Sequence, residues 1–139
     1  MLEVAVENKA QKDVPRFDWV TERSQCTLPK VFYNLRIQVE EDVKTRNALR
    51  PENSPYEFSV SEDIDEFRVV LQANEQREAV IFSLAKQAIL VRDDNGNPLF
   101  EVIAAFSEDG KCKLFVNETE RDSWQVRRMA LDGLMFRGN

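Results

Sequence analysis

The chain contains no histidine among its 139 residues, so it lacks the side chain that most often moves protons near neutral pH. Ser–His and Cys–His catalytic pairs and histidine-containing zinc sites are therefore excluded within it. It has four glycines and no Gly-x-Gly-x-x-Gly or Walker-type run, so we expect no glycine-rich phosphate-binding loop. Catalysis would have to depend on carboxylates, lysines or tyrosines. We predict a non-catalytic protein with no cofactor and no catalytic residue.

One acidic stretch superficially matches a calcium-binding loop. Asp93, Asn95 and Asn97 occupy the first three ligand positions of an EF-hand. That loop also needs Gly at its sixth position and Glu at its twelfth, where this chain has Pro98 and Ala104. The Asn-Gly pair at the centre is the strongest short-range signal for a β-hairpin. We therefore predict a hairpin turn here and no metal site.

A second acidic stretch, residues 62–66, has the sequence Glu-Asp-Ile-Asp-Glu with no positive charge. It could bind a divalent ion or a basic partner. Charge runs are usually solvated surface, and acidic side chains also protect the edge of a sheet from further pairing. The pattern therefore favours a solvated turn.

Aromatic and arginine side chains are the candidates for binding a partner. Phe17 and Trp19 lie near the start of the chain, while Trp124, Arg127 and Arg128 lie near the start of the last helix. Phe17 and Trp19 could bind another protein, or they could anchor the N-terminal segment by packing on the rest of the domain. Burial of aromatic area is favourable, so it favours the anchor. The second group could contact an anion or an aromatic group, or Trp124 could close the core. These five residues are the possible partner-binding set.

The two cysteines, Cys26 and Cys112, are far apart in the sequence and are too few for a disulfide framework. Cys112 alternates with apolar residues in a predicted strand, so we expect it to be a small core residue. Cys26 precedes a predicted helix cap and is expected to be partly exposed.

The charge balance argues against nucleic acid. The chain has 25 acidic and 19 basic residues, with a net charge of −6. Nucleic-acid binding proteins show a basic patch that neutralises phosphates, and the bases here are dispersed. No window approaches the ~18 apolar residues of a membrane span, and no signal peptide is visible. We predict a cytoplasmic protein that binds neither nucleic acid nor membrane.

The clearest local element is a helix over residues 28–50. Thr27 is its N-cap, and Pro29 stands in the first turn, where the missing N–H is harmless. Apolar residues then recur at helical spacing on one face: Leu28, Phe32, Leu35, Val39 and Val43. The residue before Pro51 is forced out of the helical region, which ends the element.

Residues 57–116 form a series of short apolar strands separated by polar turns, which predicts an antiparallel meander of about five or six strands. A second helix should follow, starting at a capping box over residues 117–120 or at Asp122-Ser123. The predicted fold is α+β: N-terminal helix, meander, C-terminal helix. Residues 1–16 are predicted to be a mobile arm and residues 17–139 a single domain. We recognise no family in these residues.

Two strands, at residues 80–82 and 102–106, are apolar on both faces. Two helices cover only one face of a sheet, so the other needs the N-terminal arm, curling of the sheet, or another chain. We therefore predict a protein-interaction module that binds a partner or itself, as a homodimer, through an apolar sheet face. The alternative is a small-ligand domain whose pocket a curled sheet encloses. We expect the predicted helical stripe to be buried together with Phe67, Val69, Phe82, Leu90 and Leu114.

Overall fold

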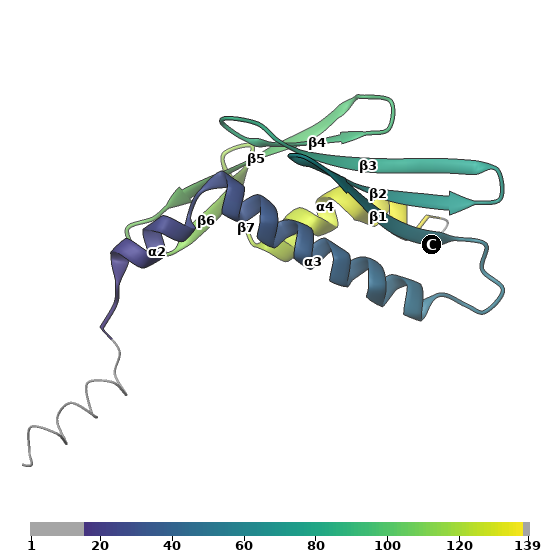
Figure 1. Cartoon of the computed structure of the whole chain (residues 1–139), viewed down its shortest axis with the longest axis horizontal. Coiled ribbons are helices and arrows are strands. Elements are labelled where there is room, and N and C mark those ends of the chain that lie inside the picture. The colour runs from purple at the N-terminus through teal and green to yellow at the C-terminus, as the bar shows by residue number, and fades with distance from the viewer. Residues whose placement is uncertain (1–15, 138–139) are drawn as a thin grey trace, which may run out of the picture.

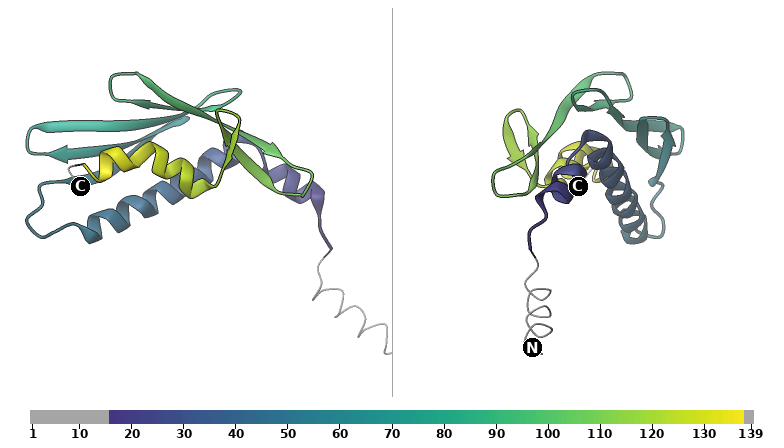
Figure 2. Two further views of the ribbon diagram at one scale, coloured as in Figure 1. Left: turned by 180° about the vertical axis from the view of Figure 1, so that it is seen from behind. Right: turned by 60° about the vertical axis from the view of Figure 1, so that its left-hand side comes forward.

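The computed structural model describes residues 16–137, in which two helices cover one face of an antiparallel sheet (Figure 1). The sheet arches over these helices, as the right-hand view of Figure 2 shows. A shorter helix lies at one end of the molecule, beside the last strands. The predicted α+β class is confirmed. The predicted mobile arm, residues 1–16, lies outside the described residues except for Arg16.

The helices and strands follow in this order: α2 (Trp19–Gln25), α3 (Leu28–Leu49), β1 (Glu57–Asp63), β2 (Glu66–Ala73), β3 (Gln76–Leu84), β4 (Ile89–Asp93), β5 (Pro98–Phe106), β6 (Cys112–Val116), β7 (Thr119–Arg121) and α4 (Ser123–Met135). The seven strands pair in chain order, each antiparallel to its neighbours. The sheet therefore has seven strands rather than the five or six expected, and β7 is a strand that was not expected.

The α3 helix forms as its sequence predicts. The Thr27 side chain accepts a hydrogen bond from the Lys30 amide, a proline lies in the first turn, and Arg50 is extended at the C-terminal end. The buried face consists of four residues at helical spacing: Phe32, Leu35, Val39 and Val43. In the part of the chain that the structure describes, no helix has a stretch long and apolar enough to cross a membrane.

The core lies between the sheet and the two long helices. Phe67 of β2 stacks on Phe82 of β3 with ring centroids 4.5 Å apart, and Phe32 of α3 packs 5.2 Å from Phe67. Aromatic pairs of this kind, one stacked and one tilted, stabilise a core beyond the area that they bury. Most of the expected core residues are fully buried. Leu28 and Leu114 are only partly buried against the core, and Leu90 is also only partly buried.

The turns explain the extra strand. Gly96 and Gly110 adopt positive φ at the two predicted hairpin turns, which confirms both. Asn117 and Glu118 also have positive φ, at 52° and 66°, and they form a two-residue turn between β6 and β7. A capping box at residues 117–120 is therefore wrong, since these residues belong to a hairpin. The alternative start is correct: Asp122 caps α4, with a reciprocal bond from its backbone amide to Gln125.

The outer face of the sheet needs less cover than its sequence suggests. Ile81 of β3 points away from the helices and is nevertheless only 5% exposed. Its cross-strand neighbours on either side are Arg68 and Arg92, whose long stems can lie over an apolar side chain. Both guanidinium groups bind Glu66, at 2.7 Å and 3.0 Å. The arginine pair therefore covers part of the face for which a partner was expected.

The edge of the sheet at β1 is partly occupied by a side chain of α3. The Asn47 amide donates to the Phe58 carbonyl (2.8 Å) and accepts from the Phe58 amide (3.0 Å). Arg50 donates to the Tyr56 carbonyl next to it at 2.9 Å. These bonds satisfy backbone groups that an edge strand would otherwise leave to solvent.

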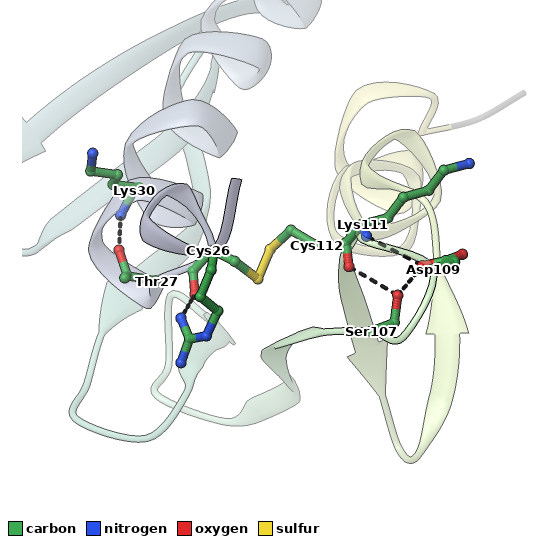
Figure 3. The surroundings of a disulfide bond; sticks show 8 residues. Cys26, Thr27, Lys30, Ser107, Asp109, Lys111 and Cys112 are labelled. Carbon is green, nitrogen blue, oxygen red and sulfur yellow. Dashed lines mark hydrogen bonds between the residues drawn. A yellow bond between two sulfur atoms is a disulfide. The ribbon is translucent and has the colours of Figure 1, made fainter. Parts of the chain in front are cut away.

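The interpretation of the cysteines was wrong. Cys26 and Cys112 form a disulfide, with Cα atoms 5.3 Å apart (Figure 3). Cys26, expected to be partly exposed, is buried at 6%, whereas Cys112, expected in the core, is exposed. This end of the sheet projects past α3 and α4, with only the short helix α2 beside β6, and Val116 is the one fully buried residue of β6 (Figure 1).

Candidate functional site

The five predicted partner-binding residues fall into two places. Trp124, Arg127 and Arg128 lie in the first turns of α4 and line a groove between α3 and α4. Phe17 and Trp19 lie at α2, at the end of the molecule beside β6. The structure therefore brings three of the five together and separates the other two.

The groove exists because α3 and α4 run in the same direction, side by side (Figure 2). Three side-chain contacts join the two helices, and they occur in the same order along both. Gln38 binds Ser123, Asp42 binds Arg127, and Arg46 binds the carbonyl of Met135, so both helices advance together along the groove.

The groove has a volume of about 390 Å³. Its α3 wall comprises Asp42, Thr45, Arg46 and Leu49, one stripe at helical spacing. Its α4 wall is a matching stripe that begins at Trp124 and ends at Met135 and Phe136 just beyond the helix. The groove is thus the seam left on the side of the two helices that faces away from the sheet.

Large apolar side chains are exposed along this seam. Leu49 is 71% exposed, Trp124 53% and Phe136 47%. Leu131 and Met135 form a buried floor that is continuous with the core. Exposed apolar groups that gather around a groove tend to mark a contact surface, whereas single ones are ordinary.

Arg127 joins the two helices. Its Nε donates to the Asp42 carboxylate at 2.7 Å, and its Nη1 donates to the Ser123 hydroxyl at 2.8 Å. Its side chain is only 17% exposed and that of Asp42 is 34% exposed. Arg127 is therefore already engaged in holding α4 against α3, and it contributes to the shape of the groove rather than to binding an anion.

Arg128 differs from its neighbour. Its side chain is 69% exposed, and its one ion pair among the described residues is a long contact of 3.4 Å with Asp132, one turn further along α4. Exposed pairs of this kind are worth little. Arg128 is therefore available to a carboxylate brought to the rim of the groove.

Arg46 is a groove residue that the sequence did not single out. Its guanidinium stacks between Phe58 and Phe136, 5.6 Å and 4.9 Å from the ring centroids, and its Nε donates to the Met135 carbonyl at 2.9 Å. The bond satisfies one of the carbonyls left open at the end of α4. Arg46 is thus a fixed part of the groove wall.

The second place centres on α2, which buries none of its residues. Trp19 is 61% exposed and Phe17 is 56% exposed. Phe17 lies directly over Gly110, where a Cβ atom would come within 2.6 Å of the ring. Asp18 caps α2, and its hydrogen bonds from Thr21 lower the pKa of the Asp18 carboxyl. The predicted anchor is therefore partial, since Phe17 packs on one turn and Trp19 remains largely exposed.

A smaller apolar patch lies on the outer face of the sheet. Leu99 and Ile103 of β5 are each 46% exposed, and Phe115 is the cross-strand neighbour of Ile103. Together with Pro98 they border a shallow depression. This patch is what remains of the apolar sheet face expected from the sequence.

The acidic side chains that the sequence singled out are engaged in local structure. Asp93 accepts hydrogen bonds from the backbone amides of Asn97 and Asn95; the bond from Asn97 is the main cause of the lowered pKa of Asp93, and both bonds close the β4–β5 turn. Glu66 accepts from Arg68 and Arg92, and the hydrogen bond from Arg68 is the main cause of its lowered pKa. Within residues 16–137 no three Asp, Glu or Cys side chains are grouped to hold a metal ion.

No family model, curated protein or solved structure matches this chain.

Proposed function

We propose that this chain is a non-catalytic protein-interaction module and that its binding surface is the groove between α3 and α4. The observation that carries the proposal is the gathering of Leu49, Trp124 and Phe136 around a buried apolar floor. We choose the helices rather than the sheet because the stems of Arg68 and Arg92 flank Ile81 in the middle of the outer sheet face, which leaves a smaller apolar patch at Leu99 and Ile103.

The groove suits an amphipathic helix from another protein. A helix laid between two parallel helices presents side chains at positions i, i+3, i+4 and i+7 to the seam, which matches the stripes on α3 and α4. Trp is enriched among the residues that dominate binding energy. Arg128 at the rim favours a helix that carries an acidic residue beside its apolar face.

The alternative expected from the sequence, a small-ligand pocket under a curled sheet, has little support. The space under the arch is filled by the stack of Phe32, Phe67 and Phe82, so a ligand there would have to displace core side chains.

Site-specific crosslinking tests the groove. A photoreactive benzophenone side chain replaces Thr45 in the groove wall, and the matched control carries it at Ile64, which is 86% exposed in the β1–β2 turn. After crosslinking in cells and mass spectrometry, Thr45 should capture a helical segment with an apolar face and at least one Asp or Glu. The substitution Leu49→Ser should abolish this product, and Ile64→Ser should not.

The proposal is wrong if both positions capture the same set of proteins, or if Leu49→Ser leaves the Thr45 product unchanged. Trp124 supplies an independent readout, because Trp19→Phe leaves it as the one tryptophan of the chain. Its emission should shift to shorter wavelength when a synthetic peptide of the captured sequence binds, since the indole leaves water.

Self-association through the outer sheet face is the second candidate, favoured by the exposure of Leu99 and Ile103. Stable dimers bury roughly 800 Å² on each partner, more than a few half-exposed side chains supply. Sedimentation at micromolar concentration decides: a single species at the 16.2 kDa of the monomer excludes it. A dimer that Ile103→Lys dissociates and Leu49→Lys does not would support it.

The cytoplasmic location expected from the sequence stays a prediction. A disulfide that persists in the cell is typical of an oxidising compartment, whereas cytosolic thiols are kept reduced. Trapping the redox state of Cys26 and Cys112 in intact cells with an alkylating reagent distinguishes the two compartments.

A further inference from the structure

We propose that the Cys26–Cys112 disulfide is a redox latch that holds α2 against β6, and that its reduction releases α2 while the sheet, α3 and α4 stay folded. The pairing has no alternative within the chain, which contains two cysteines. The bond joins residues 86 positions apart, at the junction of α2 with α3 and at the start of β6 (Figure 3).

Little else in the described structure attaches α2 to the body. The helix buries no residue, and β6 is the strand that it contacts most. The side-chain hydrogen bonds of its described residues all stay within residues 18–30, so none reaches the sheet. Phe17 on Gly110 is the one further contact that we identify at the β5–β6 turn.

The region next to the disulfide is open. A cleft of about 470 Å³ separates the first half of α3 from β6 and β7, and it is lined mainly by polar side chains. Cys112 of the disulfide lines this cleft together with Gln25, and so do Gln38 and Ser123, which share a hydrogen bond. Apolar packing therefore does not replace the disulfide when the disulfide opens.

The main core does not depend on this bond. Cys26 is buried but does not belong to the cluster of side chains between sheet and helices, and that cluster begins on α3 at Phe32. Leu35, Val39 and Val43 continue it along the helix. A break at residue 26 therefore lies outside the packed part of α3.

The chemistry needs a dithiol reductant. Its thiolate attacks the sulfur of Cys112, which belongs to the exposed partner, and the electron pair of the disulfide bond leaves on the sulfur of Cys26. The second thiol of the reductant then displaces Cys112 from the mixed disulfide. The protein gains two electrons and two protons as two thiols, and the reductant becomes a disulfide.

Release of α2 changes how the aromatic side chains of Phe17 and Trp19 are held. In the oxidised state Phe17 and Trp19 are fixed beside β6, and in the reduced state the segment that carries them moves freely about residue 26. The latch thus controls a second apolar segment, independently of the α3–α4 groove.

Hydrogen exchange measured by mass spectrometry on the full chain tests the latch, with and without dithiothreitol. Reduction should speed exchange of the α2 amides on the order of tenfold or more, while peptides from residues 35–43 and from β2 and β3 stay protected over the same short labelling times. The double variant C26S/C112S should show the reduced pattern in both conditions. The substitution Phe17→Ala in the oxidised protein should produce only a small change, because the disulfide still holds α2.

Three outcomes would overturn the proposal. The first is unchanged exchange of α2 on reduction, which would mean that other contacts hold it. The second is loss of protection in the core peptides at these short labelling times, which would make the bond a support of the whole fold. The third is an intact mass, measured without reductant after exposure to air, that still includes both thiol hydrogens. This mass would show that the disulfide does not form.

Discussion

The part of the molecule under the arch of the sheet and the end that carries α2, β6 and β7 are stabilised by different forces. Under the arch, Leu35, Val39, Phe67 and Phe82 are at most 1% exposed. At the other end Val116 is the one fully buried residue of β6, and neither β7 nor α2 has any. A disulfide and surface ion pairs of Lys113 with Asp109 and Glu120 take the place of packing there.

This difference teaches where the chain can change shape. Apolar burial is cooperative across many contacts, so the packed part opens only by global unfolding. The other end depends on a few separate bonds, and each of them responds to its own condition: reductant, acid or salt. Substitutions in the two regions should therefore affect different measurements.

The largest effect is expected for Phe82→Ala. This residue is fully buried and stacks on Phe67, so its removal leaves a cavity and should lower the free energy of unfolding by about 3–5 kcal/mol. Ile103→Ala on the half-exposed outer face is the matched control and should cost about 0.5 kcal/mol. Urea denaturation followed by circular dichroism measures both. If both substitutions lowered the free energy of unfolding equally, the contrast between the packed core and the open surface would be wrong.

The second effect is expected for C26S/C112S. Losing a cross-link over 86 residues should lower the free energy of unfolding by about 2–4 kcal/mol, mainly because the unfolded chain gains freedom. The transition should stay cooperative, and the circular dichroism spectrum should lose at most the signal of one short helix. Wild-type protein in dithiothreitol should match the variant. A variant that is as stable as the oxidised wild type would show that the bond does not constrain the chain.

A smaller effect separates two adjacent arginines. Arg127→Ala removes a half-buried ion pair with Asp42 and should cost about 1–2 kcal/mol. Arg128→Ala removes an exposed pair and should cost at most about 0.5 kcal/mol. Thermal unfolding of both variants at low salt tests this order. If Arg128→Ala were the more damaging, the assignment of Arg127 to the helix seam and of Arg128 to the rim would be reversed.

The smallest effect concerns acid. Hydrogen bonds from Ser107 and then Lys113 lower the pKa of Asp109 from 3.8 to about 2. Because the folded pKa lies below the unfolded value, the stabilisation is present above about pH 4 and is lost as pH falls toward 2. When the pH is lowered from about 4 to 2, the free energy of unfolding of Asp109→Asn should therefore fall by less than that of the wild type. NMR titration of the Asp109 carboxyl gives the pKa directly, and a value near 3.8 would contradict the prediction.

The α3 helix and two of the hairpin turns could be predicted because their signals are local. The apolar stripe of α3 repeats every three or four residues, and the glycines at positions 96 and 110 stand where hairpin turns need positive φ. Each of these features is contained within a few turns or residues of the chain.

The disulfide, the strand β7 and the groove could not be predicted in this way. Nothing in the spacing of Cys26 and Cys112 indicates that α2 and β6 meet, since 86 residues separate them. The turn before β7 uses Asn117 and Glu118, and a Glu at positive φ is not a usual turn signal. The groove depends on how α3 and α4 lie side by side. From the sequence alone Arg46 cannot be distinguished from other solvated helix residues, because its partner, the Met135 carbonyl, is on the other helix.

The amide of Asn47 has a consequence for solubility. A sheet of seven strands has two edges, and β1 at one of them offers backbone groups that a strand of another molecule could pair with. Asn47 binds both the N–H and the C=O of Phe58, as a residue of an eighth strand would. An incoming chain must first break both bonds and displace α3 from the edge. Growth of the sheet into a fibre is therefore obstructed at β1 by a single side chain of its own helix.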